Sequence, residues 1–156
     1  MAGSVDGSII DFTAVDTVKQ FPLGTEKSAT DGNTYVYIEA DEALDQYAAC
    51  RLLEDGGSDE LTTTNSGAVP TQVVVPQVAI ASGSFGWAVA KGLSFSVLAL
   101  ANCAADVKVY TTATAGAIDD TATDLIQGLR LNAANGGSTA AVNATAVSYM
   151  RTNAQD

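Results

Sequence analysis

The side chains of this sequence that are best suited to chemistry are carboxylates, because histidine is absent. The acids form two groups that are close in sequence: Asp119, Asp120 and Asp124, and Asp55, Asp59 and Glu60. Several carboxylate oxygens can hold a hard cation such as Ca²⁺, but neither group has the spacing of a known calcium-binding loop. We therefore interpret both groups as solvated loop charge, with weak cation binding as the alternative, and predict no metal site.

The nucleophilic side chains lack the partner that would activate them. Without histidine, neither a Ser-His-Asp nor a Cys-His site can be assembled, and no phosphate loop, dinucleotide fingerprint or paired-cysteine zinc pattern occurs. Cys50 and Cys103 lie in apolar stretches, which favours buried thiols over a disulfide. A glycosidase, with two carboxylates that flank a sugar groove, stays the enzyme alternative. We predict that the chain is not an enzyme, with no catalytic residues and no cofactor.

The charge balance excludes several classes of partner. The 18 Asp and Glu residues outnumber the 7 Lys and Arg residues and give a net charge of −11. Phosphate backbones and anionic membrane surfaces repel such a protein, so we expect no nucleic-acid and no membrane partner. The most apolar stretch, residues 85–105, is interrupted by Lys91 and by several glycines and serines, unlike a membrane span. Residues 1–6 lack the basic and apolar regions of a signal peptide, so we expect synthesis in the cytoplasm.

The positions of turns and apolar runs predict a mainly β chain. A length of 156 residues indicates one domain, and many short strands between turn residues are typical of a sandwich or barrel. We expect a single antiparallel β-sandwich or barrel-like domain at 26–156, with strands near 34–38, 72–81, 85–91, 93–97, 106–111, 125–131 and 141–151. One short helix is expected at 41–49, because Leu44 and Ala48 fall at helical spacing and acids occupy the first turn.

Residues 1–25 are predicted to form an extended N-terminal arm. Apolar side chains are frequent there, but they follow neither a period of 2 nor one of 3.6. Exposed together, they would form an unusual patch on a monomer. We therefore predict that deletion of residues 1–20 leaves the domain folded, and that the arm makes intermolecular contacts through Ile9, Ile10, Phe12, Phe21 and Leu23. A loosely ordered tail is the alternative interpretation.

The stretch at 85–91 alternates in the way that a strand does. Phe85, Trp87 and Val89 share one face, and the other face carries only small residues. The small face allows another layer or another chain to approach closely. We expect Trp87, the only tryptophan, to be buried in the core rather than to serve as a platform for a ligand.

The same region resembles a family of phage structural proteins. Residues 82–92, SGSFGWAVAKG, resemble a stretch of the form small-Gly-small-aromatic-Gly-Trp-x-Val-x-x-Gly found in capsid cement, or decoration, proteins of tailed phages, several from marine hosts. Residues 21–25, FPLGT, and 31–38, DGNTYVYI, are similar to the way such proteins enter their domain. Residues 112–117, TATAGA, are similar to their loop after a Val-rich strand. The resemblance spans residues 21–130, without the loop at 54–67.

The resemblance implies a β-rich module that binds the outer surface of the phage head and stabilises the shell. Its partner would be the major capsid protein, it would act as a homotrimer, and it would be made in the host cytoplasm and carried on the virion. Binding only to the expanded shell would stabilise that state by mass action. The alternative is a head-fibre or adhesin-like module that binds glycans, which an exposed aromatic cluster near Trp87, Tyr35 or Tyr37 would favour.

Overall fold

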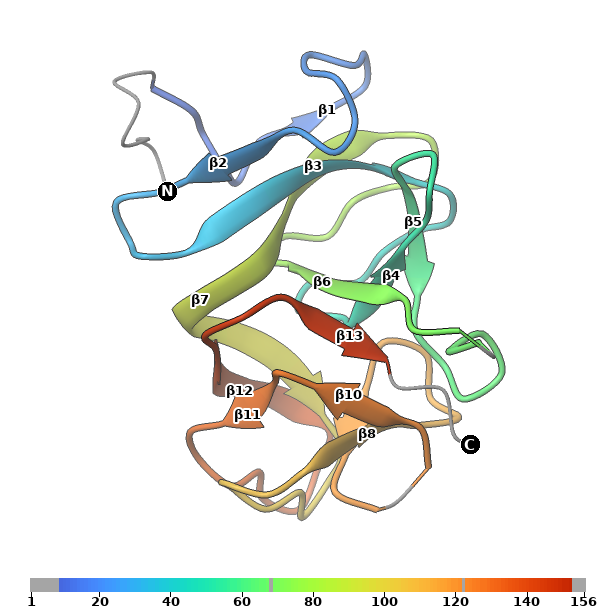
Figure 1. Ribbon diagram of the computed structural model, residues 1–156, viewed down its shortest axis with the longest axis vertical. Helices are drawn as coiled ribbons and strands as arrows, with labels where there is room; N and C mark the ends of the chain where they lie inside the picture. Colours follow the sequence, from blue (N-terminus) through green and yellow to red (C-terminus); the bar gives the residue numbers. More distant parts are fainter. Residues whose placement is uncertain (1–8, 68, 122, 153–156) are drawn as a thin grey trace.

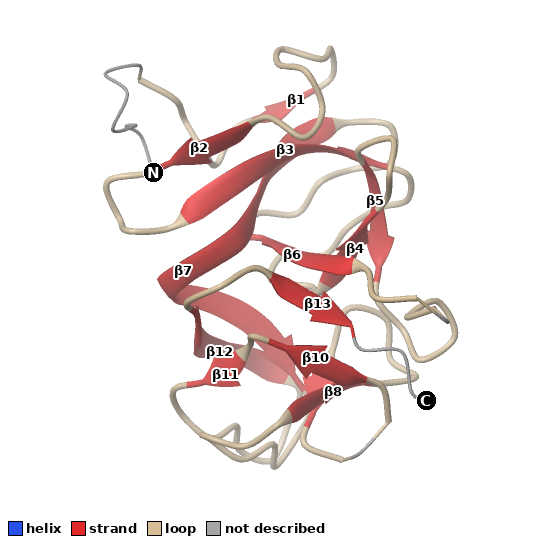
Figure 2. Ribbon diagram, viewed as in Figure 1, coloured by secondary structure: helices blue, strands red, loops and turns tan. Residues whose placement is uncertain are grey.

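The computed structural model describes residues 9–67, 69–121 and 123–152 (Figure 1). Strands joined by loops and turns make up these ranges, and no helix occurs in them (Figure 2). The strands are β1 (Val15–Asp16), β2 (Glu26–Ser28), β3 (Thr34–Ala40), β4 (Cys50–Leu52), β5 (Gly57–Glu60), β6 (Gln72–Pro76), β7 (Phe85–Ala99), β8 (Val109–Thr111), β9 (Ile118–Asp119), β10 (Leu125–Gln127), β11 (Arg130–Leu131), β12 (Ala140–Ala146) and β13 (Met150–Thr152). The prediction of a mainly β chain is confirmed.

The sheet contains two closed rings, in each of which every strand is hydrogen-bonded to the next and the last strand pairs with the first. One ring runs through β7, β3, β5, β4 and β6, and the other through β7, β9, β8, β10, β13 and β6, so that the two share β6 and β7. Most pairs are antiparallel, but β3 and β5 are parallel, as are β7 and β9. The sheet is therefore mixed and ring-forming: it is mostly antiparallel, as expected, but it includes two parallel pairs.

The long strand β7 belongs to both rings. Its first half, 85–91, pairs with β3, and its second half, 92–99, pairs with β12. Two strands were predicted here, at 85–91 and 93–97, but one continuous strand passes through Gly92 and bends as it crosses the molecule (Figure 1). A Cβ at position 92 would collide with the Asn33 side chain, so glycine is the residue that fits this crossing.

Side chains alternate between two hydrophobic cores along the central strands. In β7, Trp87 and Val89 belong to the larger core, whereas Ala88 and Ala90 belong to the smaller one. The smaller core gathers side chains from β3, β4, β6 and β7 and therefore fills the five-strand ring. The layer that approaches the small face of β7 comes from the same chain, because Ile80 packs there. The predicted burial of Trp87 is confirmed, with 1% of its surface exposed.

The short helix predicted at 41–49 does not form, and that prediction is wrong. Leu44 and Ala48 are buried in the smaller core, which accounts for their helical spacing without a helix. The backbone N–H and C=O groups of Leu44 pair instead with Ile80, at N···O distances of 2.8 and 2.9 Å. Tyr47 has a left-handed φ of 69°, which interrupts any helical run. Because these backbone groups find partners across the fold, no helix is needed to satisfy them.

Candidate functional site

The residues predicted as an intermolecular interface divide between the core and the surface. Ile10 and Phe12 are buried within the chain's own larger core. The Phe12 ring stacks on Tyr35 at a centroid distance of 4.4 Å and meets the Trp87 ring edge-on at 5.2 Å. Side chains enclosed in this way have no surface left for a partner. Ile10 and Phe12 therefore serve the chain's own core, and neither is placed at the proposed interface below.

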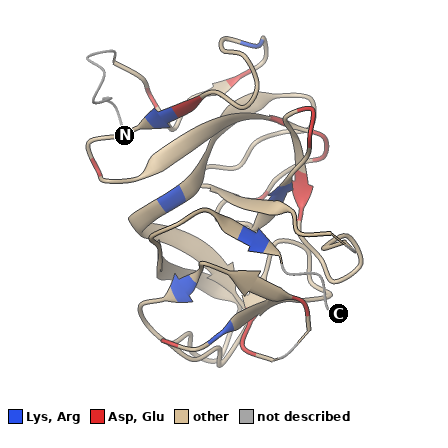
Figure 3. Cartoon of the chain, in the orientation of Figure 1, with Lys and Arg blue, Asp and Glu red and all other residues tan. Residues whose placement is uncertain are grey.

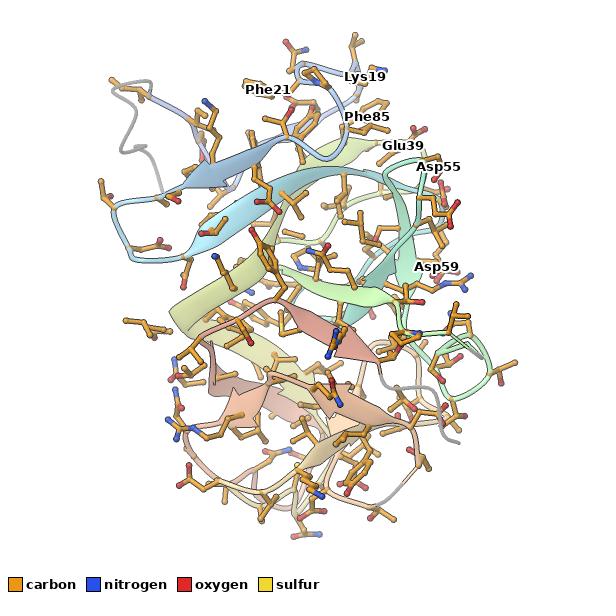
Figure 4. The ribbon with its side chains drawn as sticks, viewed as in Figure 1. Lys19, Phe21, Glu39, Asp55, Asp59 and Phe85 are labelled. Atoms are coloured by element: carbon orange, nitrogen blue, oxygen red, sulfur yellow. The ribbon has the colours of Figure 1, made fainter. Side chains whose placement is uncertain are left out.

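Phe21 and Leu23 are partly buried and pack against the same core. The Phe21 ring meets the rings of Tyr37 and Trp87, each at a centroid distance of 5.2 Å. Phe85, from the start of β7, stacks on the same Tyr37 ring at a centroid distance of 6.3 Å, and Figure 4 labels Phe21 and Phe85 in this region. The described part of the predicted arm thus adds two aromatic side chains, from Phe12 and Phe21, to the cluster around Trp87.

A hydrogen-bond network ties the same segment to the sheet. β1 pairs with the start of β7, and the Tyr37 hydroxyl donates a hydrogen bond to Asp16 Oδ2 at 2.6 Å. The Gln20 N–H donates to the same hydroxyl oxygen at 3.2 Å. Burial, together with the Asp16 hydrogen bond, raises the pKa of Tyr37 to about 12. From residue 9 onward, the predicted arm is therefore integrated into the domain that was expected to begin at residue 26.

The described part of this segment leaves Ile9, Val15 and Val18 exposed, and Ile9 and Val18 are the most exposed of the three. Ile9 is 87% exposed and Val18 is 68% exposed. Of the five residues predicted at an interface, Ile9 alone is largely free of contacts with the core. Residues 1–8, which belong to the predicted arm, lie outside the described residues.

The first group of carboxylates does not assemble as the sequence grouped it. Asp119 and Asp120 lie beside the Cys103 thiol, with their potential ligand atoms within 4.8 Å of one another. Asp124 instead accepts a hydrogen bond from the Ser66 hydroxyl. Burial, with the nearby charge of Asp120, raises the pKa of Cys103 to about 11, so this thiol is protonated at neutral pH. Asp120 accepts a hydrogen bond from the Ala104 N–H at 2.9 Å and thereby anchors a loop.

The second group of carboxylates also serves structural contacts. Asp59 accepts two hydrogen bonds from the Arg51 guanidinium, at 2.5 and 2.7 Å. Glu60 is buried and accepts a hydrogen bond from the Asp45 N–H at 2.7 Å. Burial raises the pKa of Glu60, and the charges of Asp45 and Glu42 raise it further. Asp55 accepts the Gly57 N–H at 3.0 Å, within the turn between β4 and β5.

Eight acids gather on one side of the molecule and define an acidic face. They are Glu39, Asp41, Glu42, Asp45, Glu54, Asp55, Asp59 and Glu60. Figure 3 shows acidic residues in red around the end of β3 and around β5, and Figure 4 labels Glu39, Asp55 and Asp59 there. Arg51 is the only Lys or Arg between residues 39 and 60. Burial raises the pKa of Asp41, and the charges of Asp55 and Glu39 add to the effect, as expected where like charges are crowded.

A second surface combines exposed apolar side chains with cations, and we call it the basic groove. It consists of three shallow hollows of about 180, 200 and 580 Å³. Val147 lines the first and second hollows, and Gly128 lines the second and third, so the three are continuous. The residues that give the groove its character are Lys91, Leu93, Arg130, Val147, Tyr149 and Arg151.

The basic groove is unlike the rest of this acidic protein. Three of the seven Lys and Arg residues line it, and among the described residues no Asp or Glu does. Leu93 is 65% exposed and Val147 is 77% exposed. The Lys91 ammonium lies 4.6 Å from the centre of the Tyr149 ring, and at the rim the Tyr149 hydroxyl donates a hydrogen bond to Glu26 at 2.7 Å. Sequence reasoning missed this surface, because its members come from four separate strands and turns.

A polar hollow of about 350 Å³ lies elsewhere on the sheet, lined by Asp31, Asn33, Tyr35, Ser94, Ser96 and Asn143 among others. Its polar groups bind one another: the Asn33 amide donates to Asp31 and to the Ser94 carbonyl, both at 2.9 Å. Its aromatic side chain Tyr35 is buried, as are Tyr37 and Trp87, so none of the three offers an exposed ring for a ligand.

The chain's function has to be inferred without a known relative. Within the described ranges the structure has no helix that could cross a membrane. The functional interpretation therefore depends on the chain's own surfaces: the acidic face, the basic groove and the exposed part of the N-terminal segment. None of the family models, curated proteins or solved structures with which the chain was compared matches it.

Proposed function

We propose that this protein is a capsid cement, or decoration, protein that binds the outer surface of a phage head and stabilises the shell. In this proposal it is made in the host cytoplasm, acts as a homotrimer and contacts the major capsid protein. The resemblance of residues 82–92 to that family supports the proposal. The observation that carries the homotrimer in this proposal is the basic groove, since large apolar side chains exposed along one continuous surface are typical of protein interfaces.

The chemistry of the described side chains is better suited to contacts than to turnover. Asp59, Glu60 and Asp120 each accept hydrogen bonds that hold the fold. The Cys103 thiol is protonated at neutral pH because its pKa is raised, and a protonated thiol is a poor nucleophile. The proposal therefore includes the absence of enzymatic activity. Turnover of an ester, glycan or phosphate substrate that is lost in Asp120→Asn would contradict it.

The exposed apolar residues of the N-terminal segment are proposed to contact the capsid. Ile9 and Val18 project from a segment that Phe12 and Phe21 fix to the core. A contact held on a rigid scaffold loses less conformational entropy on binding than a free tail does. A shell presents many identical sites, so modest contacts at each site add to a large stabilisation of the whole particle.

The test is a binding assay on undecorated, expanded shells. Purified wild-type protein should bind to saturation and raise the temperature at which the shells break. A variant with Ile9→Asp and Val18→Asp should bind at least about tenfold more weakly, which corresponds to ~1.4 kcal/mol. The matched control carries Val69→Asp and Val107→Asp, two exposed valines outside the segment, and should bind as wild type does. Failure of the wild-type protein to bind such shells would reject the proposed function.

The second candidate function is a head-fibre or adhesin-like glycan-binding module. The polar hollow favours it, because hydroxyl, amide and carboxylate groups converge there. The buried state of Tyr35 speaks against it, since an exposed ring is the usual platform for a sugar. Saturation-transfer NMR with neutral oligosaccharides distinguishes the two functions. A signal that disappears in Asn143→Ala would favour glycan binding over capsid binding.

A further inference from the structure

The basic groove and the acidic face are complementary in charge and lie on different parts of one chain. Three cations and no carboxylate line the groove, whereas the 39–60 segment carries eight acids and only Arg51 as a cation. Lys91 belongs to β7, Arg130 to β11 and Arg151 to β13, whereas the acids of the acidic face lie at the end of β3, in β5 and in the loops between β3, β4 and β5. Figure 3 shows Lys and Arg in blue and Asp and Glu in red. A protein with a net charge of −11 would be expected to repel other copies of itself. This separation of charge gives two copies one relative orientation in which they attract.

We propose that the basic groove binds the acidic face of a second copy of this chain, in a head-to-tail contact. This contact would be the one that joins the subunits of the proposed homotrimer. Its role on a phage shell rests on the proposed function. Because the two surfaces differ, the contact is heterologous, and successive copies close into a ring when the rotation between them allows it.

The apolar side chains of the groove supply the part of the contact that charge alone does not. Leu93 and Val147 line the same hollow and are largely exposed, so a bound partner would remove both from water. Around them, Arg130 Nε lies 3.5 Å from Asp106, and both side chains are more than half exposed. An exposed pair of this kind contributes little to stability, so Arg130 can exchange it for a partner's carboxylate.

On the acidic face, Asp41 and Asp45 are the carboxylates best placed to receive these cations. Both are exposed, and their neighbours Asp59 and Glu60 are occupied by Arg51 and by the Asp45 N–H. The raised pKa of Asp41 reflects partial desolvation of its carboxylate by neighbouring atoms and the nearby like charges of Asp55 and Glu39. A partner's guanidinium would relieve this crowding, which favours the complex over the separated chains.

The experiment is sedimentation velocity on the isolated protein, without shells. Wild-type protein should associate in a concentration-dependent way, and raising NaCl from about 50 mM to about 500 mM should weaken the association, because salt screens exposed charges. Arg130→Glu with Arg151→Glu should weaken it at least about tenfold. Asp41→Lys with Asp45→Lys should have a similar effect, and so should Val147→Ser, which changes no charge.

Mixing the two charge-reversed variants is the most specific arm of this experiment. Each variant keeps one native surface, so an equimolar mixture should form heterodimers more strongly than either variant associates with itself. The matched control is Lys19→Glu with Lys108→Glu, which changes the net charge as the groove variant does but at exposed positions outside the groove. It should associate as the wild type does, and circular dichroism should show that every variant is folded.

Several results would overturn the inference, and they differ from those that would reject the capsid function. A monomeric wild-type protein at all concentrations would overturn it, even if the protein still binds shells. Normal association of the Asp41→Lys/Asp45→Lys variant would show that the groove takes a different surface. If the wild type is monomeric and the Arg130→Glu/Arg151→Glu variant no longer binds shells, the groove contacts the capsid and not a second copy. An associating protein that does not bind shells would support the contact and reject the proposed function.

Discussion

Replacement of Phe12 by alanine tests whether the N-terminal segment belongs to the core. The Phe12 side chain is only 1% exposed, stacks on Tyr35 and meets Trp87 edge-on. Truncation of a buried phenylalanine to alanine costs about 3–5 kcal/mol, and aromatic pairs contribute about 0.5–1.5 kcal/mol beyond their buried area. We therefore expect a loss of about 4 kcal/mol, a large part of the 5–15 kcal/mol typical of a domain.

The assay is equilibrium unfolding in urea, followed by the fluorescence of Trp87. This single tryptophan lies against the Phe12 ring and therefore reports on its surroundings. The control is Val18→Ala in the same segment, which is exposed and should change stability by no more than about 0.5 kcal/mol. A loss below about 1 kcal/mol for Phe12→Ala would refute the reasoning. Deletion of residues 1–20, expected from the sequence to leave the domain folded, should instead be strongly destabilising, because it removes Phe12 and β1.

Four further outcomes are expected. Trp87→Ala should cost about 3–5 kcal/mol in the same assay, because the side chain is buried among other rings; a solvent-like emission maximum in the wild type would contradict this. Tyr37→Phe should cost about 1 kcal/mol through loss of the hydrogen bond to Asp16, and a neutral result would show that this bond contributes nothing. Glu60→Gln should be more stable than wild type near pH 7, with the difference shrinking toward pH 4. The pKa of the Glu60 carboxyl is raised in the folded state, so the stability of the wild type is unaffected below the pKa of the unfolded chain and falls as pH rises past the folded pKa. Glutamine stays neutral and avoids this loss. A stability difference that does not depend on pH would contradict this. Cys103 should react slowly with a thiol reagent at pH 7, since burial raises its pKa to about 11; reaction as fast as that of a free thiol would contradict this.

The period-2 pattern explains which parts of the fold were predictable from sequence. Alternation at 85–91 correctly placed Trp87 in the core, since a strand presents successive side chains to opposite faces. The same period continues through Leu93, yet Leu93 is exposed, because β7 exchanges β3 for β12 as its partner near Gly92. A change of partner depends on strands distant in sequence, and a local pattern does not contain it.

The helix predicted at 41–49 is absent, and residues 9–25 of the predicted arm pack against the core, for a related physical reason. Leu44 and Ala48 have helical spacing, but Leu44 pairs with Ile80, a contact that the sequence separation hides. Phe12 lacks a periodic context, but it fills a place among rings that arrive from β3 and β7. Local periodicity predicts elements that bury one regular face, and it fails for segments that are held by tertiary contacts.

The candidate surfaces were predictable only in part. The run of acids between residues 39 and 60 is visible in the sequence, and these acids come close together because β5 pairs with both β3 and β4. The basic groove was not predictable, because Lys91, Arg130 and Arg151 are isolated in sequence and meet only when β7, β11 and β13 are assembled. Both cysteines are buried and free, as expected. The residues that surround them could not be predicted from the sequence.

The copy number of this chain on purified phage particles tests the central claim most directly. Quantitative mass spectrometry of intact virions, before and after removal of loosely bound protein, measures the ratio of this chain to the major capsid protein. A capsid cement protein should be present in a fixed, high ratio, and shells stripped of it should break at lower temperature and regain their stability when it is added back. Absence of the chain from the particles, or a few copies per particle with no effect on the shell, would contradict the account.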